Sequence, residues 1–159
     1  MPLKDIVLDT NVLEHADNSL EKRNTASIML LYSVNSSSVK LCLDWNTKKS
    51  FDVAQSIIWT QYLERLNPMM QGYKMLEYLL KNKRIKPVSR NVALNVNKII
   101  IQRIKDPQDK VFVKVVHGSI SKVLVSHDFR DFQIAKRKFF KKKLKISIIT
   151  ADQIDLNEL

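Results

Sequence analysis

The chain has 159 residues, 45% of them hydrophobic, which predicts one domain over residues 1–159 and leaves no room for a second. Basic residues number 27 against 16 acidic ones, a net charge of +11, so the expected partners are polyanions such as nucleic acid or an anionic membrane surface. Cys42 is the only cysteine, which excludes an intrachain disulfide and a thiolate metal cluster and predicts a reducing, cytoplasmic location.

No apolar stretch approaches the roughly 18 residues needed to cross a bilayer, and a charged pair, Lys4 and Asp5, precedes the first apolar run. We therefore expect neither a signal peptide nor a membrane anchor. The two glycines, Gly72 and Gly118, exclude a glycine-rich phosphate loop and argue against an all-β fold with many tight turns.

The first half of the chain predicts strands that alternate with helices. Residues 6–8 are apolar, β-branched and bounded by Asp5 and Asp9, which is typical of a short buried parallel strand. The next helix is expected to begin with Asn18 or Ser19 as its cap. The inward residues of this helix are predicted to be Ile28, Leu31 and Tyr32. A second strand is predicted at 39–43, and the inward residues of the helix after it are predicted to be Ala54, Ile57, Ile58, Gln61, Tyr62 and Leu66.

The second half continues the alternation. A helix is predicted after Asn67 and Pro68, then a short strand at 85–88 that Pro87 confines to a sheet edge, because proline lacks an amide hydrogen. The remaining elements are a helix over 92–104, a helix from Asp106, a buried strand at 123–125, a helix with Phe132, Ala135 and Phe139 inward, and a last strand at 146–149. This order predicts a three-layer α/β/α sandwich with a central, mostly parallel sheet of four to five strands.

Two of the central strands deliver an aspartate at the carboxyl end, Asp9 after residues 6–8 and Asp128 shortly after residues 123–125. Ligands of parallel sheets collect at that end, and adjacent strands lie only about 4.8 Å apart. Two carboxylates so close repel each other unless a cation lies between them. Asp109 begins the helix before the second of these strands and is expected at the same edge, whereas Asp5 lies at the opposite end.

A cluster of aspartates of this kind is the expected cage for Mg²⁺ or Mn²⁺, which prefer carboxylate oxygens and retain several waters. Such an ion supports hydrolysis of a phosphodiester. A structural alternative stays open for each residue: Asp9 as a helix cap, and Asp109 as the third residue of a helix capped by Asp106, with Asp106 a weaker metal candidate. The three histidines, His15, His117 and His127, have no metal-ligand spacing and are interpreted as surface or packing residues.

Residues 136–145 form a basic run that favours contact with the phosphates of a polyanion over a merely solvated face, because like charges in sequence repel each other. A wider apolar face would be needed for membrane binding, so no membrane partner is expected. The predicted nucleic-acid-binding residues are Lys136, Arg137, Lys138, Lys141, Lys142 and Lys143.

Three segments, residues 6–13, 106–109 and 123–132, resemble the PIN domain family of metal-dependent ribonucleases in order and spacing over almost the whole chain. The resemblance implies metal-ligand roles for Asp9, Asp109 and Asp128, with Asp131 close by. It also implies that Thr10, Asn11 and Ser126 orient those carboxylates or a water. Gln61 stands where the family usually supplies a Glu, which predicts weaker metal affinity; Asp44, or less well Glu64, is a candidate to compensate.

The resulting hypothesis is a Mg²⁺- or Mn²⁺-dependent endoribonuclease acting on single-stranded or structured RNA. By analogy with the family and from its small size, we interpret it as the toxin of a toxin–antitoxin pair, with an antitoxin or a second copy of the chain as protein partner. The alternative, motivated by Gln61, is a degenerate domain that binds RNA or a protein without cutting. Phosphotransfer of the haloacid dehalogenase type is disfavoured, because it needs an aspartate where this chain has Asn11.

Overall fold

The computed structural model describes residues 2–159 and contains one sheet of five parallel strands in the order β3-β2-β1-β4-β5. The bounds of the strands are Asp5–Leu8 (β1), Lys40–Trp45 (β2), Ile85–Ser89 (β3), Val123–Val125 (β4) and Ser147–Ile149 (β5). The predicted α/β/α sandwich with a parallel sheet of four to five strands is thereby confirmed, and β3, which contains Pro87, is an edge strand as expected.

Seven helices flank this sheet. Their bounds are Thr10–His15 (α1), Asn24–Ser36 (α2), Ile57–Arg65 (α3), Gln71–Lys81 (α4), Leu94–Arg103 (α5), Pro107–Gly118 (α6) and Ile134–Leu144 (α7), and short 3₁₀ turns lie at Val53–Gln55, Ala151–Gln153 and Leu156–Glu158. Within residues 2–159, no helix is both long and apolar enough to cross a membrane.

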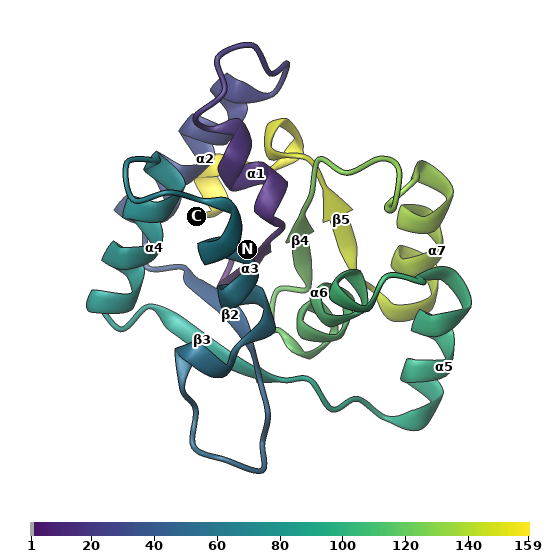
Figure 1. Cartoon of the computed structure of the whole chain (residues 1–159). Coiled ribbons are helices and arrows are strands. Elements are labelled where there is room, and N and C mark those ends of the chain that lie inside the picture. Colours follow the sequence, from purple (N-terminus) through teal and green to yellow (C-terminus); the bar gives the residue numbers. More distant parts are fainter. Residues whose placement is uncertain (1) are drawn as a thin grey trace.

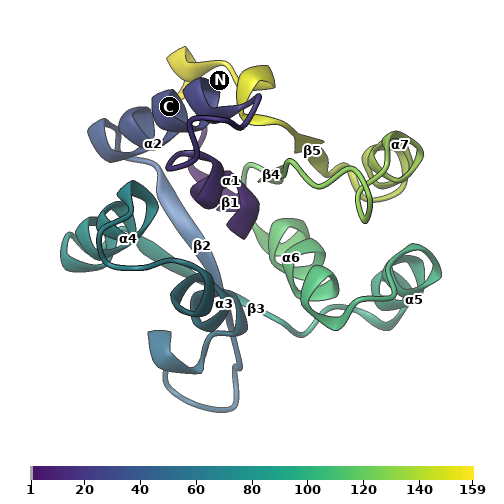
Figure 2. The same cartoon turned by 45° about the horizontal axis from the view of Figure 1, so that its top comes forward.

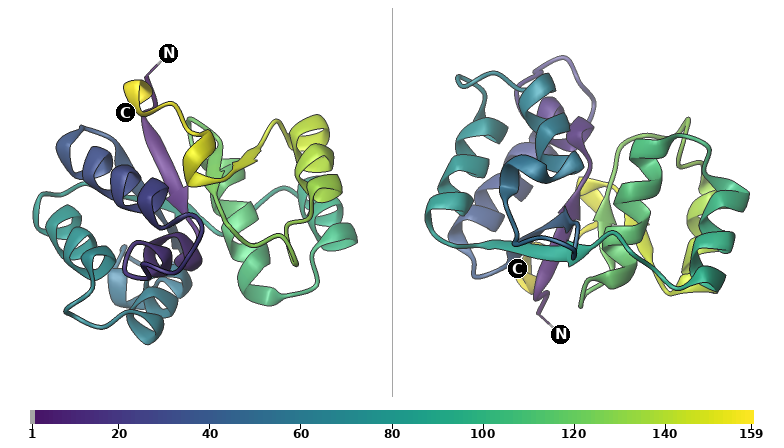
Figure 3. Two further views of the ribbon diagram at one scale, coloured as in Figure 1. Left: turned by 90° about the horizontal axis from the view of Figure 1, so that it is seen from above. Right: turned by 60° about the horizontal axis from the view of Figure 1, so that its bottom comes forward.

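The helices fall into two groups, α1 to α4 on one side and α5 to α7 on the other (Figures 1 and 3). Helix α6 packs against β1, β2, β3 and β4, and α5 packs on α6 away from the strands (Figure 2). This division follows from the path of the chain. From β1 the connections run outward to β2 and β3, and then the chain returns to place β4 on the other side of β1. The direction of the crossovers therefore reverses between β1 and β4.

The sheet is buried on both faces at its centre, where every residue of β1 and β4 is buried. Tyr62 of α3 is also fully buried, and its hydroxyl donates a hydrogen bond of 2.5 Å to the carbonyl oxygen of Leu8, the last residue of β1. Helix α4 reaches α1 closely at Gly72, where a Cβ atom would lie 2.9 Å from the Cβ of Leu13. These contacts fix α1, α3 and α4 around the carboxyl end of β1.

Asp5 lies at the amino end of β1, as the sequence predicted, and is fully buried. Burial favours its neutral form, but hydrogen bonds from Lys86, Ile120 and Ser121 outweigh this effect and lower its pKa. The distances to its carboxylate are 2.5 Å from Lys86 Nζ, 2.9 Å from the Ile120 amide and 2.8 Å from the Ser121 amide. Asp5 therefore joins β1 to β3 and to the turn before β4.

The start of the second helix differs from the prediction. Asn18 does not cap it: its Oδ1 accepts a hydrogen bond from the Leu20 amide in a local turn, and α2 begins only at Asn24. Asparagine favours such turns for the same reason that it favours caps, since its short side chain reaches a nearby amide. Within this helix, Tyr32 is 74% exposed, so its predicted inward position is wrong.

Two other inward positions also differ. Ala54 is exposed because the helix expected there is divided into a 3₁₀ turn and α3. In α7, Ala135 is exposed and Phe140 is fully buried in its place. Gln61, in contrast, is only 8% exposed, so its predicted inward orientation is confirmed.

Asp44, near the end of β2, caps helix α3 from the sheet. Its carboxylate accepts hydrogen bonds from Ser56 Oγ (2.6 Å), the Ile57 amide (2.9 Å) and the Ile58 amide (2.8 Å). Its Oδ2 also pairs with Nε of Arg90 at 3.3 Å. With both oxygens engaged and the residue fully buried, Asp44 is not available for the compensating role that the sequence suggested beside Gln61.

We expect Asp44→Ala to lower the free energy of unfolding by about 3–5 kcal/mol, because Arg90 and the amides at the start of α3 lose their partner in a buried place. Urea denaturation followed by circular dichroism measures the loss. The control is Asp52→Ala, which removes an exposed cap on the Ala54 amide and should cost only about 1 kcal/mol. Equal losses in the two variants would contradict this interpretation of Asp44.

Candidate active site

The candidate site lies where the crossovers reverse, at the carboxyl ends of β1 and β4. In open parallel sheets this is the position at which ligands bind. Leu8 pairs with Val125 in the sheet, and the amide of Asp9 donates to the carbonyl oxygen of Val125 at 2.9 Å. Asp9 thus leaves β1 beside the end of β4 and remains only 6% exposed.

Ser126 and Asn11 hold the Asp9 carboxylate from two sides. The hydroxyl of Ser126 donates to Asp9 Oδ2 at 2.7 Å, and the amide of Asn11 donates to the same oxygen at 3.2 Å. Ser126 Oγ also accepts from the amide of Asp128 (3.1 Å), and Asn11 Oδ1 accepts from the amide of His127 (3.0 Å). The two side chains therefore connect the end of β1 with the segment that follows β4.

Asp128 shapes the segment that carries Asp131. Its Oδ1 accepts hydrogen bonds of 2.9 Å from the amides of both Arg130 and Asp131, which folds the chain into a tight turn. Asp131 is partly exposed at the mouth of the site. The aspartates predicted at the ends of β1 and β4 therefore meet at one edge of the sheet.

Asp109 enters from α6 on the same side. Asp106 caps this helix by accepting from the amides of Gln108 (2.8 Å) and Asp109 (3.1 Å), as the sequence predicted. A hollow of about 310 Å³ lies beside the helix start. Its charged lining residues are Arg103, Lys105, Asp106, Asp109, Asp131 and Lys136.

The carboxylates of this edge oppose each other's ionisation. Burial, and then the charge of Asp128, raise the pKa of Asp9 to about 6, although the Ser126 hydrogen bond and the charge of Arg65 lower it. Burial, and then Asp106, Asp9, Asp131 and Asp128, raise the pKa of Asp109 to about 7. Burial and Asp128 likewise raise the pKa of Asp131. Burial is the largest cause for all three carboxyl groups and the neighbouring carboxylates add to it, so ionisation of the whole set is unfavourable.

Two buried side-chain oxygens at this edge of the fold have no hydrogen-bond partner, Thr10 Oγ1 and Gln61 Oε1. Thr10 follows Asp9 directly and is fully buried at the start of α1. Gln61 lies one helical turn before Arg65, whose charge acts on Asp9, and residues four apart share a helix face. Both belong to the predicted supporting set, and both offer an acceptor atom that the protein itself does not use.

The basic residues predicted to bind nucleic acid divide into three groups. Lys138, Lys142 and Lys143 are exposed on α7, and Lys141 donates to Ser147 Oγ at 2.9 Å. Lys136 turns toward the hollow and donates to the carbonyl oxygen of Asp131 at 3.1 Å. The third group is Arg137 alone.

Arg137 binds the protein backbone instead of solvent. Its guanidinium donates to the carbonyl oxygens of Ser126 (3.1 Å), Asp128 (3.0 Å) and Phe132 (2.7 Å), and it stacks on the ring of Phe129 at 4.1 Å. It holds the segment 126–132, which carries Asp128 and Asp131. Arg137 is therefore a positioning residue, not part of the exposed basic face of α7.

The histidines near this edge bind each other. His15 Nδ1 and His127 Nδ1 lie 2.8 Å apart, and His127 Nε2 accepts from the amide of Ala151 at 3.0 Å. His127 therefore carries its proton on Nδ1 and donates it to His15. Burial, and then the charge of His15, lower the pKa of His127 to about 4. The pair packs together, in agreement with the expectation from sequence.

The fit of a divalent ion depends on how many ligands the protein must supply. Among residues 2–159, no group of three or more His, Cys, Asp or Glu side chains converges closely enough to hold an ion unaided. Mg²⁺ retains several waters and is commonly bound through only one or two carboxylates. The donors present, carboxylate oxygens of aspartates whose ionisation is unfavourable together, suit such an ion. The residues that would hold it, directly or through its waters, are Asp9, Asp109, Asp128 and Asp131.

Arg103 and Lys105 line the hollow together with the acids, and neither was predicted from the sequence as a site residue. A signal was present, since both lie within the three residues before Asp106, around the end of a predicted helix. Basic residues are also common at the end of a helix for a structural reason, because they complement the helix dipole. This explanation is sufficient for both residues, so their position in the site was not predicted.

The raised pKa of Asp109 predicts a pH-dependent effect of Asp109→Asn on the metal-free protein. Folding favours the neutral acid, so its ionisation destabilises the fold progressively as pH rises from about 4 to 7. Above that range, Asp109→Asn should stabilise the fold by about 1–2 kcal/mol after allowance for solvent screening, a rise in Tm of roughly 2–8 °C. Thermal melts in EDTA should show this gain at about pH 8 and none at about pH 4. A gain that does not depend on pH would contradict the assignment to charge.

In comparisons with known proteins, no family model matches the chain, and no curated protein matches it.

Proposed function

We propose that the chain is a Mg²⁺- or Mn²⁺-dependent endoribonuclease of the PIN type. The observation that carries the proposal is the set of aspartates at the reversal point of the sheet, whose pKa values are raised by burial and by one another. A protein that gains no stability from such repulsion gains cation affinity from it. Beside the acids, the bases Arg103, Lys105 and Lys136 line the same hollow, which suits a ligand that carries both a phosphate and a metal.

When bound at this edge, a divalent ion would supply charge neutralisation for a phosphate and would lower the pKa of a water. The residues of the chain hold and orient the reactants. Asp9, fixed by Ser126 and Asn11, and Asp109, fixed at the start of α6, would bind the ion with Asp128 and Asp131. Arg103, Lys105 and Lys136 would contact the phosphate oxygens. Arg137 keeps Asp128 and Asp131 in place through the backbone carbonyls around them.

The proposal extends to biological context. A chain of this size, with an exposed basic helix face, suits a cytoplasmic toxin that an antitoxin partner restrains. A second candidate is a domain that binds RNA without cutting. The observation that favours it is Gln61, a neutral amide in a buried position where an acid would add a ligand. Metal-dependent turnover distinguishes the two.

Replacing one of the central acids tests the proposal. Asp9→Asn and Asp128→Asn should each lower Mn²⁺-dependent cleavage of single-stranded RNA by more than about 100-fold, since loss of even an outer-shell partner commonly costs 10–100-fold. Each variant should keep a folded circular dichroism spectrum. The matched control is Asp155→Asn, which changes an exposed aspartate near the C-terminus and should cleave like the wild type. Cleavage by a folded Asp9→Asn, Asp128→Asn double variant at the wild-type rate would refute the site.

Gln61→Glu should add the missing ligand. The new carboxylate joins Asp9 in a buried place, so it should lower Tm in EDTA and raise the Tm gained with Mn²⁺. A weakened enzyme should then need less Mn²⁺ for the same cleavage rate, whereas a binder without activity should gain cleavage. The matched control is Thr60→Glu, which adds the same charge on the exposed side of α3. Identical Mn²⁺ responses of Gln61→Glu and the wild type would show that Gln61 lies outside the site.

A further inference from the structure

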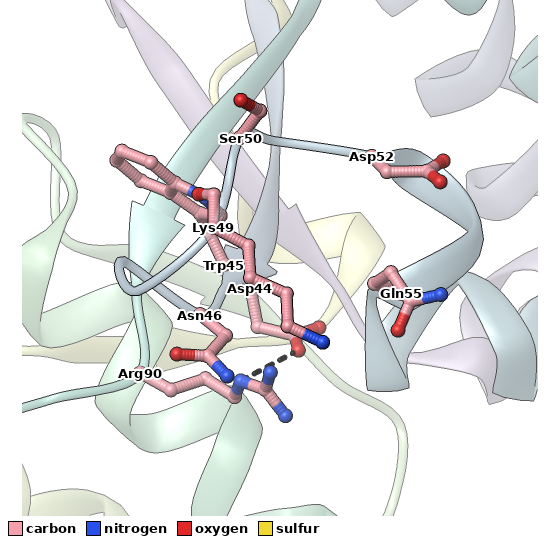
Figure 4. Close-up of a pocket in the computed structure, with 8 residues that line it drawn as sticks. All are labelled: Asp44, Trp45, Asn46, Lys49, Ser50, Asp52, Gln55 and Arg90. Carbon is pink, nitrogen blue, oxygen red and sulfur yellow. Dashed lines mark hydrogen bonds and ion pairs between the residues drawn. The ribbon is translucent and has the colours of Figure 1, made fainter.

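A second pocket lies at the same edge of the sheet, at the carboxyl ends of β2 and β3 (Figure 4). It is formed by the end of β2, the loop after it, and Arg90, which follows β3 directly. The lining residues are Asp44, Trp45, Asn46, Lys49, Ser50, Asp52, Gln55 and Arg90. None of the roles assigned above to the acidic cluster uses this pocket, apart from the structural cap made by Asp44.

Arg90 is oriented by the buried carboxylate beneath it. Its Nε pairs with Asp44 Oδ2 at 3.3 Å, and its backbone amide donates to the carbonyl oxygen of Trp45 at 3.0 Å. Among the contacts of residues 2–159, Nε is the only nitrogen of this guanidinium that has a partner. The two terminal nitrogens are therefore held in position and remain available as donors.

Lys49 approaches the guanidinium from the loop. The indole nitrogen of Trp45 donates to the Lys49 carbonyl oxygen at 2.9 Å, and the Lys49 amide donates to the Asn46 carbonyl oxygen at 3.2 Å, which fixes the loop backbone. Figure 4 shows the Lys49 side chain running toward Arg90, with the amides of Asn46 and Gln55 at the sides of the pocket. Within the described chain, the ammonium of Lys49 has no ion-pair partner.

The two acids of the pocket do not cancel these charges equally. Asp44 is occupied by the α3 cap and by Arg90. Asp52 accepts from the amide of Ala54, and Figure 4 shows its carboxylate turned away from Arg90. Lys49 and the terminal nitrogens of Arg90 are thus left as cationic donors at one small pocket, an arrangement that favours an oxyanion.

The size of the pocket limits the kinds of ligand that it can hold. Its volume of about 40 Å³ corresponds to roughly three waters, since one water needs about 10–15 Å³ measured in this way. That space suits one phosphoryl group and is too small for a nucleobase. The pocket also lies at the same edge of the sheet as the acidic cluster. β2 is the neighbour of β1, so Asp44, near the carboxyl end of β2, and Asp9, after the carboxyl end of β1, belong to the same edge.

We propose that this pocket binds one phosphodiester of an RNA strand that places another phosphodiester at the acidic cluster. The identity of the strand rests on the proposed function, whereas the phosphate site rests on Arg90 and Lys49. The pocket contributes affinity and register to the substrate and takes no part in bond cleavage.

Binding without cleavage isolates the pocket. A fluorescein-labelled single-stranded oligouridylate is titrated with the protein in EDTA, and anisotropy gives Kd at several salt concentrations. One phosphate contact contributes a slope of about 0.7 in log Kd against log salt, or about fivefold between 0.1 and 1 M. Lys49→Ala should therefore weaken binding about fivefold at 0.1 M salt and make the slope shallower by about 0.7. The matched control is Lys48→Ala, which removes the adjacent charge outside the pocket.

Arg90→Met tests the other cation of the pocket. Because this variant also removes the ion-pair partner of Asp44, its Tm is measured as well. Lys48→Ala weakening binding as much as Lys49→Ala, or neither variant changing it, would overturn the proposal. A site for a free anion is distinguished by the change in Tm that inorganic phosphate causes. If Lys49→Ala removes this change in Tm but does not lower the affinity for oligouridylate, the assignment of the pocket to RNA would be overturned. The outcome is separable from that of the nuclease test. Loss of cleavage in Asp9→Asn with unchanged oligouridylate binding in Lys49→Ala would refute the pocket alone. A Lys49-dependent affinity in a protein without cleavage would refute the nuclease alone.

Discussion

The pairing of β1 with both β2 and β4 determines which side chains meet at the carboxyl edge of the sheet. The register that sets Leu8 against Val125 brings Asp9 to Ser126, and the pairing of Ile6 with Leu41 brings the carboxyl end of β2, with Asp44, to the same edge. A shift of one residue would turn every buried side chain of β1 to the opposite face, so the core holds this register firmly. The positions of the candidate site therefore follow from the packing of an apolar strand that has no chemistry of its own.

The two aspartates at this edge, Asp44 and Asp9, have opposite surroundings. Asp44 receives three hydrogen bonds and an arginine, so its charge is used to start α3 and to aim Arg90. Asp9 receives hydrogen bonds from Ser126 and Asn11 but faces other aspartates, and its pKa is raised to about 6 by burial and by Asp128. One carboxylate is fully engaged within the protein, and the other retains capacity for a cation. The contrast distinguishes a structural acid from a candidate ligand within one sheet edge.

The sequence was sufficient to predict the sheet, the edge position of β3 and the approach of Asp9 to the end of β4, because buried parallel strands are continuous apolar runs. It was insufficient where one residue type serves two purposes. Asn18 suits a turn as well as a cap, and Arg137 in a basic run looks like its lysine neighbours until its backbone partners in the segment after β4 are known.

Pockets were the least predictable feature. Arg90 belongs to no motif, and its role arises only because β3 pairs with β2 and brings it over Asp44. Arg103 and Lys105 have a structural explanation at the end of α5, and only the folded chain brings them to the hollow with Asp109. Such contacts join residues far apart in sequence, which periodicity and local spacing do not encode.

The reversal of the crossovers also affects how the protein forms. The sheet can grow through β1, β2 and β3 from the first half of the chain, but β4 joins β1 only after more than a hundred intervening residues have been made. Contacts of such long range are formed late and slowly. Asp9 belongs to the early half, whereas Asp109, Asp128 and the arginine that holds the segment 126–132 belong to the late half. A nascent chain on the ribosome therefore exposes no assembled acidic cluster until the segment 126–132 has been made and has joined β1.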